Sequence, residues 1–428
     1  MTCHSKIGDG KMKILWLCNI ILPDFCEEFQ IKKSYLGGWM TAMLHQLEKK
    51  NEIEISMCFP IYDRNRLKDG VCNGHKYFTF LCDFHEVCTV QMIQAFEKIL
   101  EAEQWDIIHI WGTEFAHTLA MLKACGKFGL LNKVVINIQG LAFMVAKHYR
   151  ADIPKEYWIA KQGSGTSMEE EQKAYERRGV CEIESIKNTQ YVIGRTDWDR
   201  ACIQAVNPKV QYFFCGEILR EVFYKYAGTW KYEKCEKYSI FVSQATYPIK
   251  GFHYLLCALP YIIQQYPNTH VYAAGANILT RNEPYAAYLI SLIDTFRLKS
   301  HITFLGLLDE MQMIHYYQNA NVFVSSSVVE NESNSLHEAQ ILGVPCVCSY
   351  VGGAYNRIVH EMGGFLYPHD EPVLLAYYVC KLFENKDDLC ERLSLYSAHN
   401  IQKYINPQEN ADTTVNIYRK IQTEAEKT

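Results

Sequence analysis

The stretch Asn321–Gly353, NVFVSSSVVENESNSLHEAQILGVPCVCSYVGG, decides the fold of this chain. It begins with a short apolar run, Asn321–Ser325, which predicts a buried strand, and Val344–Ser349 predicts a second one. The polar loop between them leads into a helix for which Asn331 and Ser333 are both candidate caps. Because this strand–helix–strand unit is so short, we expect parallel strands joined by a right-handed crossover.

The same unit predicts an anion site. Ligands of such units bind beyond the carboxyl ends of the strands. The first helical amides, those of Asn334, Ser335 and Leu336, have no partner within the helix, and the helix dipole favours an anion beside them. Glu330 precedes this turn and Glu338 follows it. Two glutamates at this spacing are common on solvated surfaces, so it is their place between a strand and a helix that makes them candidate site residues.

Composition limits the classes of function. The 428 residues suggest two or three domains, and 49% apolar and 21% charged residues are ordinary for a globular protein. A net charge of −5 gives no electrostatic footprint for nucleic acid, so we expect no nucleic-acid partner. The 17 cysteines are scattered through apolar runs without zinc-site spacing, which favours buried free thiols in a reducing compartment.

The sequence pattern predicts neither a signal peptide nor a membrane-spanning segment. The first residues, MTCHSKIGDGKMK, are too polar for a signal peptide, and no apolar run approaches the roughly 18 residues of a membrane span. We therefore expect a cytoplasmic protein. The segment Lys147–Lys161 mixes basic and aromatic residues, and it is either a solvated loop or a peripheral contact with anionic lipids at the inner membrane face.

Strands and helices alternate along both halves. This pattern, with strands that are apolar throughout, predicts an α/β protein of two tandem Rossmann-like domains, each a doubly wound parallel sheet, facing a common cleft. We expect a first domain over 1–216, a linker over 217–236, a second domain over 237–405 and a last helix over 406–428 that packs back on the first domain. The expected strands cover 13–18, 53–59, 107–110, 134–138, 191–193, 210–214, 239–243, 269–274, 301–305, 321–325 and 344–349.

Two segments of the first half interrupt the simple pattern. Gly37-Gly38 stands between the first strand and a helix, where it either brings backbone close to a ligand or makes a plain tight turn. It is not a dinucleotide fingerprint, because G-x-G-x-x-G is absent. Residues 142–166 read as a long functional loop or lid, followed by helices over 168–178 and 180–188.

Several short motifs resemble glycosyltransferase family 4, the retaining enzymes with the GT-B fold. The resemblance is stronger in the second half, covers most of the chain, and most favours the bacterial branch that builds capsular, exo- or lipopolysaccharide. The motifs that carry it are 248–251 (PIKG), 272–275 (YAAG), 304–306 (FLG), 330–339 (ENESNSLHEA), 343–345 (GVP) and 351–353 (VGG), with Gly37-Gly38, 105–109 (WDIIH) and 194–196 (GRT) in the first half.

The resemblance implies how the donor's diphosphate is held. Lys250 would bind it and stabilise the charge on the departing group. The amides of Asn334, Ser335 and Leu336 would assist from the helix N-terminus, and the backbone at Gly38 would approach from the other domain. No metal ion and no other cofactor is expected, since lysine and amides take that part and no Asp-x-Asp signature is present.

The resemblance also assigns the two carboxylates. Glu338 would accept hydrogen bonds from the ribose hydroxyls, and Glu330 would contact the donor sugar. Retention in this fold is attributed to front-face attack through a short-lived oxocarbenium-like ion pair, with the donor phosphate taking the acceptor's proton. A double displacement through Glu330 is the alternative.

This sequence departs from the family pattern at several places. Ser243-Gln244 stands where many members carry an arginine, so a different cation is needed or the phosphate site is weaker; Arg195, at a strand end in the other half, is a candidate substitute. Gln139 occupies a place often filled by histidine. With His109 and Glu114 it forms the expected acceptor side, although a lone histidine is more often structural.

The resemblance, together with the residues above, implies a retaining, metal-independent glycosyltransferase. It would move a sugar, most simply from a UDP-linked donor, to a growing glycan that is lipid-linked in the favoured case. Two alternatives remain: a sugar-nucleotide epimerase or hydrolase of the same fold, and a catalytically silent protein that binds sugar nucleotide as a scaffold.

Overall fold

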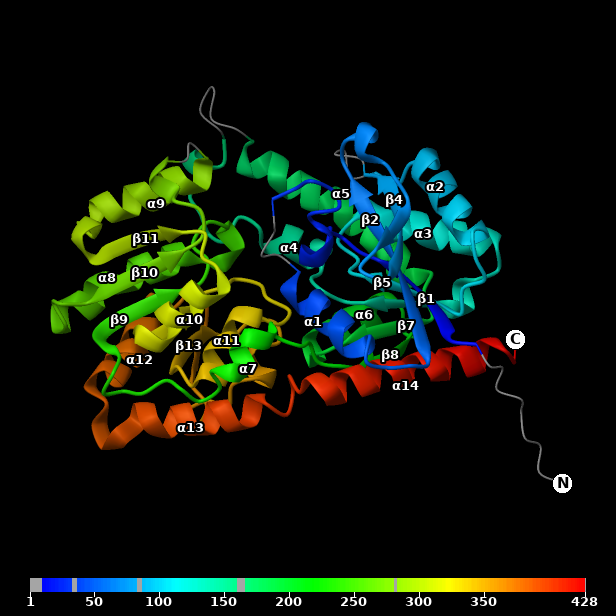
Figure 1. The fold of residues 1–428 in the computed structure, drawn as a ribbon. Coiled ribbons are helices and arrows are strands. Elements are labelled where there is room, and N and C mark those ends of the chain that lie inside the picture. Colours follow the sequence, from blue (N-terminus) through cyan, green and yellow to red (C-terminus); the bar gives the residue numbers. More distant parts are fainter. Residues whose placement is uncertain (1–9, 33–36, 83–86, 160–165, 281–282, 428) are drawn as a thin grey trace.

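The computed structural model describes residues 10–32, 37–82, 87–159, 166–280 and 283–427. They form two α/β domains that lie side by side, each built on its own largely parallel sheet (Figure 1). The predicted architecture of two tandem doubly wound domains is confirmed.

The N-terminal sheet has eight strands in the order β3-β4-β2-β1-β5-β6-β7-β8. Its pairs are parallel except for β3 and β4, an antiparallel edge hairpin that the sequence reading missed. The apolar runs became strands because helices cover both faces of the sheet and bury nearly every side chain of β1 and β5. The strands are β1 (Met12–Leu17), β2 (Ile53–Ile61), β3 (Gly70–Cys72), β4 (His75–Leu81), β5 (Ile107–Trp111), β6 (Val134–Asn137), β7 (Tyr191–Gly194) and β8 (Gln211–Phe214).

The C-terminal sheet has six parallel strands in the order β11-β10-β9-β12-β13-β14. The order reverses between β9 and β12, so this pair of neighbours forms the switch point at which α/β sheets bind ligands. The strands are β9 (Glu236–Val242), β10 (His270–Ala274), β11 (Ile302–Gly306), β12 (Ala320–Ser325), β13 (Cys346–Ser349) and β14 (Phe365–Tyr367).

Helices connect the strands and cover the sheets. Those of the first half are α1 (Gly38–Leu47), α2 (Val90–Glu101), α3 (Ala116–Lys127), α4 (Ala142–His148), α5 (Met168–Lys187) and α6 (Asp197–Val206). Those that follow are α7 (Glu221–Lys225), α8 (Phe252–Gln265), α9 (Pro284–Thr295), α10 (Glu310–Asn319), α11 (Asn334–Leu342), α12 (Pro372–Glu384), α13 (Leu389–Ile401) and α14 (Pro407–Ala425).

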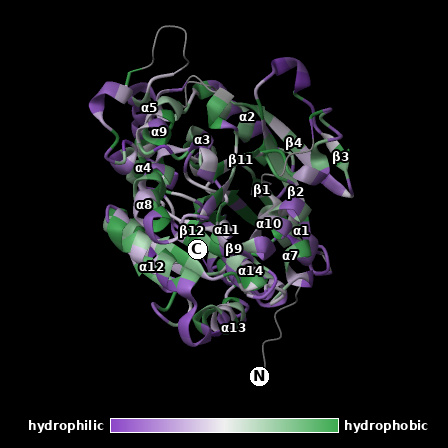
Figure 2. Cartoon of the chain, turned by 90° about the vertical axis from the view of Figure 1, so that its left-hand side faces the viewer, coloured by the Kyte–Doolittle hydropathy of each residue, from purple (hydrophilic) through white to green (hydrophobic). Residues whose placement is uncertain are grey.

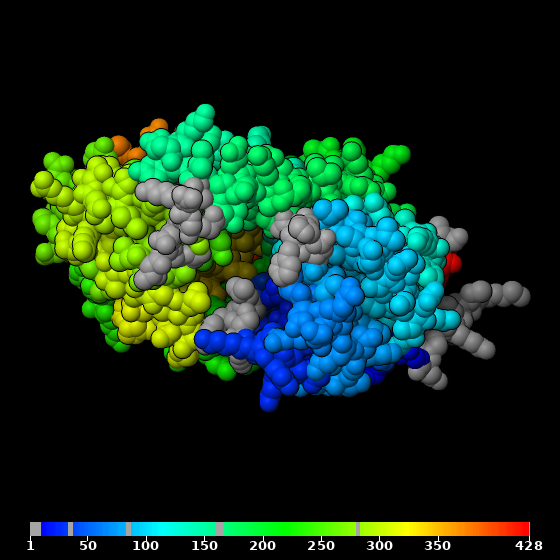
Figure 3. Space-filling view, turned by 90° about the horizontal axis from the view of Figure 1, so that it is seen from above, coloured from blue at the N-terminus to red at the C-terminus, as the bar shows by residue number. Residues whose placement is uncertain are grey.

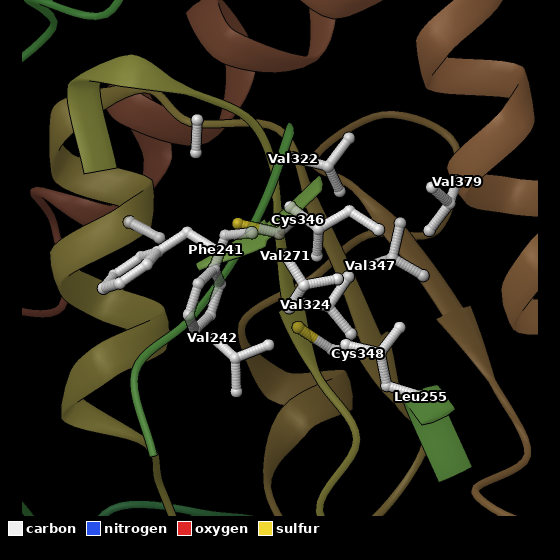
Figure 4. Close-up of a cluster of buried hydrophobic side chains, with 14 of the residues drawn as sticks. Phe241, Val242, Leu255, Val271, Val322, Val324, Cys346, Val347, Cys348 and Val379 are labelled. Atoms are coloured by element: carbon white, nitrogen blue, oxygen red, sulfur yellow. The ribbon is translucent and has the colours of Figure 1, made fainter. Parts of the chain in front are cut away.

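The C-terminal core lies between this sheet and its helices. Val322, Val324, Cys346 and Cys348 from β12 and β13 meet Val379 of α12 in the interior (Figure 4). Both cysteines are free, as expected for thiols buried in an apolar run. Most of α12 is coloured as hydrophobic in Figure 2, and most of its apolar residues are buried against this core.

The segment after β6 differs from the prediction. Residues 168–178 and 180–188 were expected as separate helices, but α5 runs unbroken through Gly179. This glycine permits close packing on α4, since a Cβ there would lie 2.9 Å from the Cα of Phe143. Glycine in this helix therefore serves packing and not termination.

The expected lid is in fact a bridge between the domains. After α4 the chain crosses to the C-terminal domain, and residues 149–158 pack on α8 and α9. His253 Nε2 donates to the Ala151 carbonyl oxygen at 2.9 Å, and the Tyr254 hydroxyl donates to Asp152 Oδ2 at 2.7 Å. Because the His253 contact is buried and the Tyr254 contact is partly buried, the segment fixes one domain against the other.

The membrane reading of this segment gains no support from its packing. Arg150 lies over the Trp158 ring at 3.9 Å, and Tyr157 packs against Tyr288. Lys161 lies outside the described residues. Among the helices that the structure describes, none combines the length and apolar character needed to cross a bilayer.

The chain returns to the N-terminal domain at its end. In Figure 1, α14 runs beneath that domain, and the Tyr418 hydroxyl accepts from Trp16 Nε1 of β1 at 3.2 Å. Residues 217–236, assigned above to a linker, pack on the C-terminal domain instead of spanning solvent. Phe223 and Trp230 are buried there, and Trp230 Nε1 donates to the Ala320 carbonyl oxygen at 2.8 Å.

Candidate functional site

A cleft of about 820 Å³ separates the two domains. Figure 3, looking down between them, shows the surface hollowed at this junction. Residues at the carboxyl ends of β9, β10 and β11 contribute to its wall, which is the expected ligand-binding edge. The lining includes Gly37, Gly38, Trp39, Leu219, Arg220, Ser243, Gln244, Gly275, Asn334, Ser335 and Glu338.

The N-terminus of α11 opens on this cleft as expected, with one correction. Asn334 and Ser335 line the cleft. The Leu336 amide was expected to bind the diphosphate, but it donates to the Ser333 Oγ at 3.3 Å and to the Ser333 carbonyl oxygen at 3.0 Å. The capping residue Ser333 therefore already accepts from the Leu336 amide, and the amides of Asn334 and Ser335 remain available to an anion.

Lys250 lies at the mouth of the switch point. It ends a short 3-10 turn after β9, and Gly251 follows in the left-handed region at φ +65°. A Cβ at Gly251 would lie 1.9 Å from the Ser326 carbonyl oxygen, so only glycine allows this turn to approach the end of β12. Ser335 of the α11 N-terminus lines the same small pocket as Lys250, which brings the lysine beside the anion site.

Glu330 forms an ion pair with Lys250. Its loop packs closely against the Gly352-Gly353 turn. A Cβ at Gly352 would lie only 1.5 Å from the Glu330 carbonyl oxygen, so only glycine allows this approach. The Gly353 amide donates to the Asn331 carbonyl oxygen at 2.9 Å. Three motifs distant in the sequence thus build one site: the lysine turn, the glutamate loop and the paired glycines.

Glu338 is buried behind the first turn of α11. Its Oε1 accepts from Arg220 Nη2 at 2.5 Å, and its Oε2 accepts from the Tyr317 hydroxyl at 3.3 Å. Burial raises the pKa of Glu338, and Arg220 opposes that shift. Sequence reasoning missed Arg220, since no motif surrounds it and only the fold brings it to the cleft.

Arg195 does not supply the missing cation. Its side chain is 4% exposed and pairs with Glu217 and Glu332, while Nη2 donates to the Gln139 carbonyl oxygen at 3.0 Å. With both carboxylates and Arg357 it forms a buried charge cluster at the domain junction. The expectation that Arg195 contacts the donor is therefore wrong. Its position at the end of a strand brings it to the domain interface, but its guanidinium is already bound by Glu217 and Glu332.

His109 is likewise a structural residue and not part of the acceptor side. It is fully buried, its Nδ1 lies 2.5 Å from the Tyr418 hydroxyl, and its ring stacks on Trp111 at 4.2 Å. Burial lowers the pKa of His109 to about 3, so the ring is neutral. The structural alternative for a lone histidine is the correct one.

Glu114 and Gln139 do lie together at the ends of β5 and β6. The Gly140 amide donates to Glu114 Oε1 at 2.6 Å, and burial raises the pKa of this carboxyl. Gln139 Nε2 donates to Asn137 Oδ1 at 2.6 Å. Both are half-buried, and an acceptor role for them stays a prediction.

The second half of the chain is similar to a known protein family. Residues 229–399 match the family model described as "Glycosyl transferases group 1". The match covers most of the C-terminal domain. The matched range contains Lys250, Glu330 and Glu338, together with the whole of the C-terminal sheet.

Two curated relatives match part of the chain. The uncharacterized glycosyltransferase MJ1607 of Methanocaldococcus jannaschii is 30% identical over 196 residues, which are 43% of this chain and 45% of that protein. Spore coat protein SA of Bacillus subtilis is 28% identical over 189 residues, 43% of this chain and 49% of that protein. The matched part thus spans less than half of each relative.

Solved structures share the whole two-domain fold. Sucrose-phosphate synthase from Thermosynechococcus elongatus superimposes with a TM-score of 0.71 at 15% identity, covering 96% of this chain and 99% of that one. HepE of Anabaena in complex with UDP-glucose gives a TM-score of 0.63 at 12% identity, covering 95% and 99%. At these identities the likeness shows the fold alone, and that fold is GT-B.

Proposed function

We propose that this protein is a glycosyltransferase that moves a sugar from a nucleotide diphosphate sugar to a growing glycan. The observation that carries the proposal is the Lys250–Glu330 pair beside the free amides of α11, within a domain that matches the group 1 family. A UDP-linked donor is the favoured one, because a protein of the same fold has been solved with UDP-glucose.

The cleft suits a reaction in which a diphosphate departs. The acceptor oxygen bonds to the anomeric carbon while the bond from that carbon to the diphosphate oxygen breaks. Lys250 and the amides of Asn334 and Ser335 stabilise the charge that develops on the leaving group. Enclosure between two domains keeps water from competing as acceptor.

We further propose that the configuration is retained and that no metal takes part. Attack occurs from the face that the diphosphate leaves, and a phosphate oxygen takes the acceptor's proton. Glu330 contacts the sugar near the anomeric carbon, and a covalent intermediate on Glu330 is the competing route. Glu338 accepts from the ribose hydroxyls, with Gly38 bringing backbone from the N-terminal domain.

The finer assignment is a role in surface polysaccharide synthesis, in the cytoplasm, on a lipid-linked acceptor at the inner membrane face. One relative carries the name of a spore coat protein, which supports a cell-surface product. Glu114 and Gln139 are the proposed acceptor contacts, since they lie at the strand ends of the domain opposite the donor site.

Release of nucleoside diphosphate from a panel of sugar nucleotides tests the proposal, with and without a glycan extract. The wild type is expected to release it only with an acceptor. K250A is expected to lose this activity, whereas K299A, at an exposed lysine of the same domain, keeps it. Donor conversion without acceptor would instead identify an epimerase or hydrolase.

Gln244 favours one further candidate, a silent sugar-nucleotide-binding scaffold. An uncharged side chain lines the cleft where a second phosphate-binding cation is expected. Nucleotide binding by the wild type without turnover in any extract would establish this scaffold and exclude the transferase.

A further inference from the structure

The family motifs in this cleft supply too little positive charge to balance a diphosphate. A nucleoside diphosphate is strongly anionic, yet the charge of Lys250 is already matched by Glu330. At the end of β9, Ser243 and Gln244 offer only neutral groups. Tight binding of a diphosphate at this edge therefore needs a further cation. The cleft lining offers the exposed Lys32 and Arg220, and of these two Arg220 is held in place by Glu338.

Arg220 lies where such a cation is needed. It belongs to the junction between β8 and α7, and it lines the cleft with Gly38 from one domain and Ser335 from the other. Its aliphatic arm packs on α1, because a Cβ at Gly38 would lie 2.7 Å from the arginine Cγ. The chain thus places a guanidinium between two helix N-termini that face one cleft.

Two helix ends strengthen the anionic preference of this spot. Helix α1 begins after Gly37, which is in the left-handed region at φ +74° and supplies no side-chain cap. Among the residues that the structure describes, no side chain accepts from the first amides of α1 or from those of Asn334 and Ser335 at α11. The positive ends of both helix dipoles therefore lie at the cleft that Arg220 lines.

The carboxylates around Arg220 hold it without saturating it. Glu338 accepts from Nη2 at 2.5 Å, and Glu310 Oε1 lies 3.8 Å from Nη1. The ring of Phe223 supports the guanidinium plane at 4.8 Å. A guanidinium has five N–H donors, so one edge can stay on Glu338 while another binds phosphate oxygens in a bidentate manner.

We propose that Arg220 binds the diphosphate of the sugar-nucleotide donor and supplies the charge that the β9 end lacks. The inference rests on the proposed function. In this arrangement Glu338 has two tasks: Oε1 orients Arg220, and Oε2, which accepts from the Tyr317 hydroxyl at 3.3 Å, has a second lone pair that can accept from the nucleoside.

Paired ligands test this assignment. We would measure binding of UDP, ADP and GDP by calorimetry and compare each with its own nucleoside. In R220Q the diphosphate affinity is expected to fall about ten- to a hundredfold, the usual effect of losing a charged hydrogen-bonded pair, while nucleoside affinity changes less than about twofold. R220K keeps the charge without the paired edge and should fall between.

The outcomes separate cleanly. An equal loss for diphosphate and nucleoside would mean that Arg220 only orients Glu338, which overturns the inference. No loss in R220Q would place the diphosphate elsewhere. A wild type that binds no nucleoside diphosphate overturns the proposed function itself. R392Q, at an exposed arginine far along the chain, is the control, and thermal unfolding without ligand confirms that R220Q and R220K are folded.

Discussion

Lys250 and Glu330 are 80 residues apart in the sequence and form an ion pair at the mouth of neighbouring strands β9 and β12. The strand order reverses between these two strands, so their loops diverge and leave room for a ligand. An anionic donor entering this space meets a lysine whose partner can turn to the sugar. The pair is therefore a charge-matched resting state of the site.

Breaking this pair from each side should give different results. E330Q releases Lys250, so UDP affinity is expected to stay within about threefold, while transfer falls about a hundredfold because the sugar contact is lost. K250M should weaken UDP binding and transfer together. Calorimetry and product release measure both quantities, and parallel losses of UDP binding in the two variants would contradict the assigned roles.

Replacing Gly352 should disturb Glu330 without touching its side chain. In G352A the new Cβ meets the Glu330 carbonyl oxygen and the residue keeps φ +51°. We expect at least about 3 kcal/mol of lost stability in urea unfolding and loss of transfer. G74A is the matched control: its φ is +81° but nothing lies within 4 Å, so backbone strain of about 1 kcal/mol is the whole effect.

Glu182 gives the protein a measurable pH dependence. Burial raises the pKa of this carboxyl from 4.5 to about 8, and Thr113 and the Phe143 amide only partly oppose the shift. The folded state holds the proton more tightly than the unfolded state, so stability falls as pH rises from about 4.5 to about 8, by at most about 1.4 kcal/mol per pH unit. E182Q should remove this slope in urea titrations at pH 5, 6.5 and 8; an unchanged slope would assign it to other groups.

The buried charge cluster predicts the opposite behaviour in acid. Burial works to raise the pKa of Glu332, but Arg357, His337 and Arg195 outweigh it and hold the pKa at about 2. Its stabilisation is therefore complete above about 4.5 and is lost as pH falls toward 2. E332Q leaves the buried Arg357 without its carboxylate and Arg195 with Glu217 alone, and it should cost about 3–5 kcal/mol at pH 7. A cost below 1 kcal/mol would show that the cluster opens to water.

The sequence predicted those parts of the site that depend on neighbours along the chain. The strand–loop–helix unit from Asn321 is local, because its caps, apolar runs and glycine turn lie within one stretch. Lys250 was assigned to this site by the family resemblance, and the structure places it in the same small pocket as Ser335. The same local logic missed the β3–β4 hairpin, which is an edge addition to the sheet.

Errors arose where a residue's surroundings come from a distant part of the chain. His109 is buried by Tyr418, 309 residues further on, and Arg195 is occupied by Glu332 from the other domain. Arg220 is the opposite case: no sequence motif singles it out, and only the fold brings it into the cleft. Leu336 failed for a subtler reason: the residue that caps a helix removes one of the amides that make its end attractive to anions.

Because α14 packs on the first domain, that domain is completed only by the last helix described in the chain. Tyr418 closes the space beside Trp16 and His109, which belong to central strands of the first sheet. A ribosome delivers those strands long before their last covering helix. Until the second domain has also been synthesised, the apolar residues of the first domain that α14 covers have no such cover. In a chain truncated before Pro407, those apolar residues would stay uncovered.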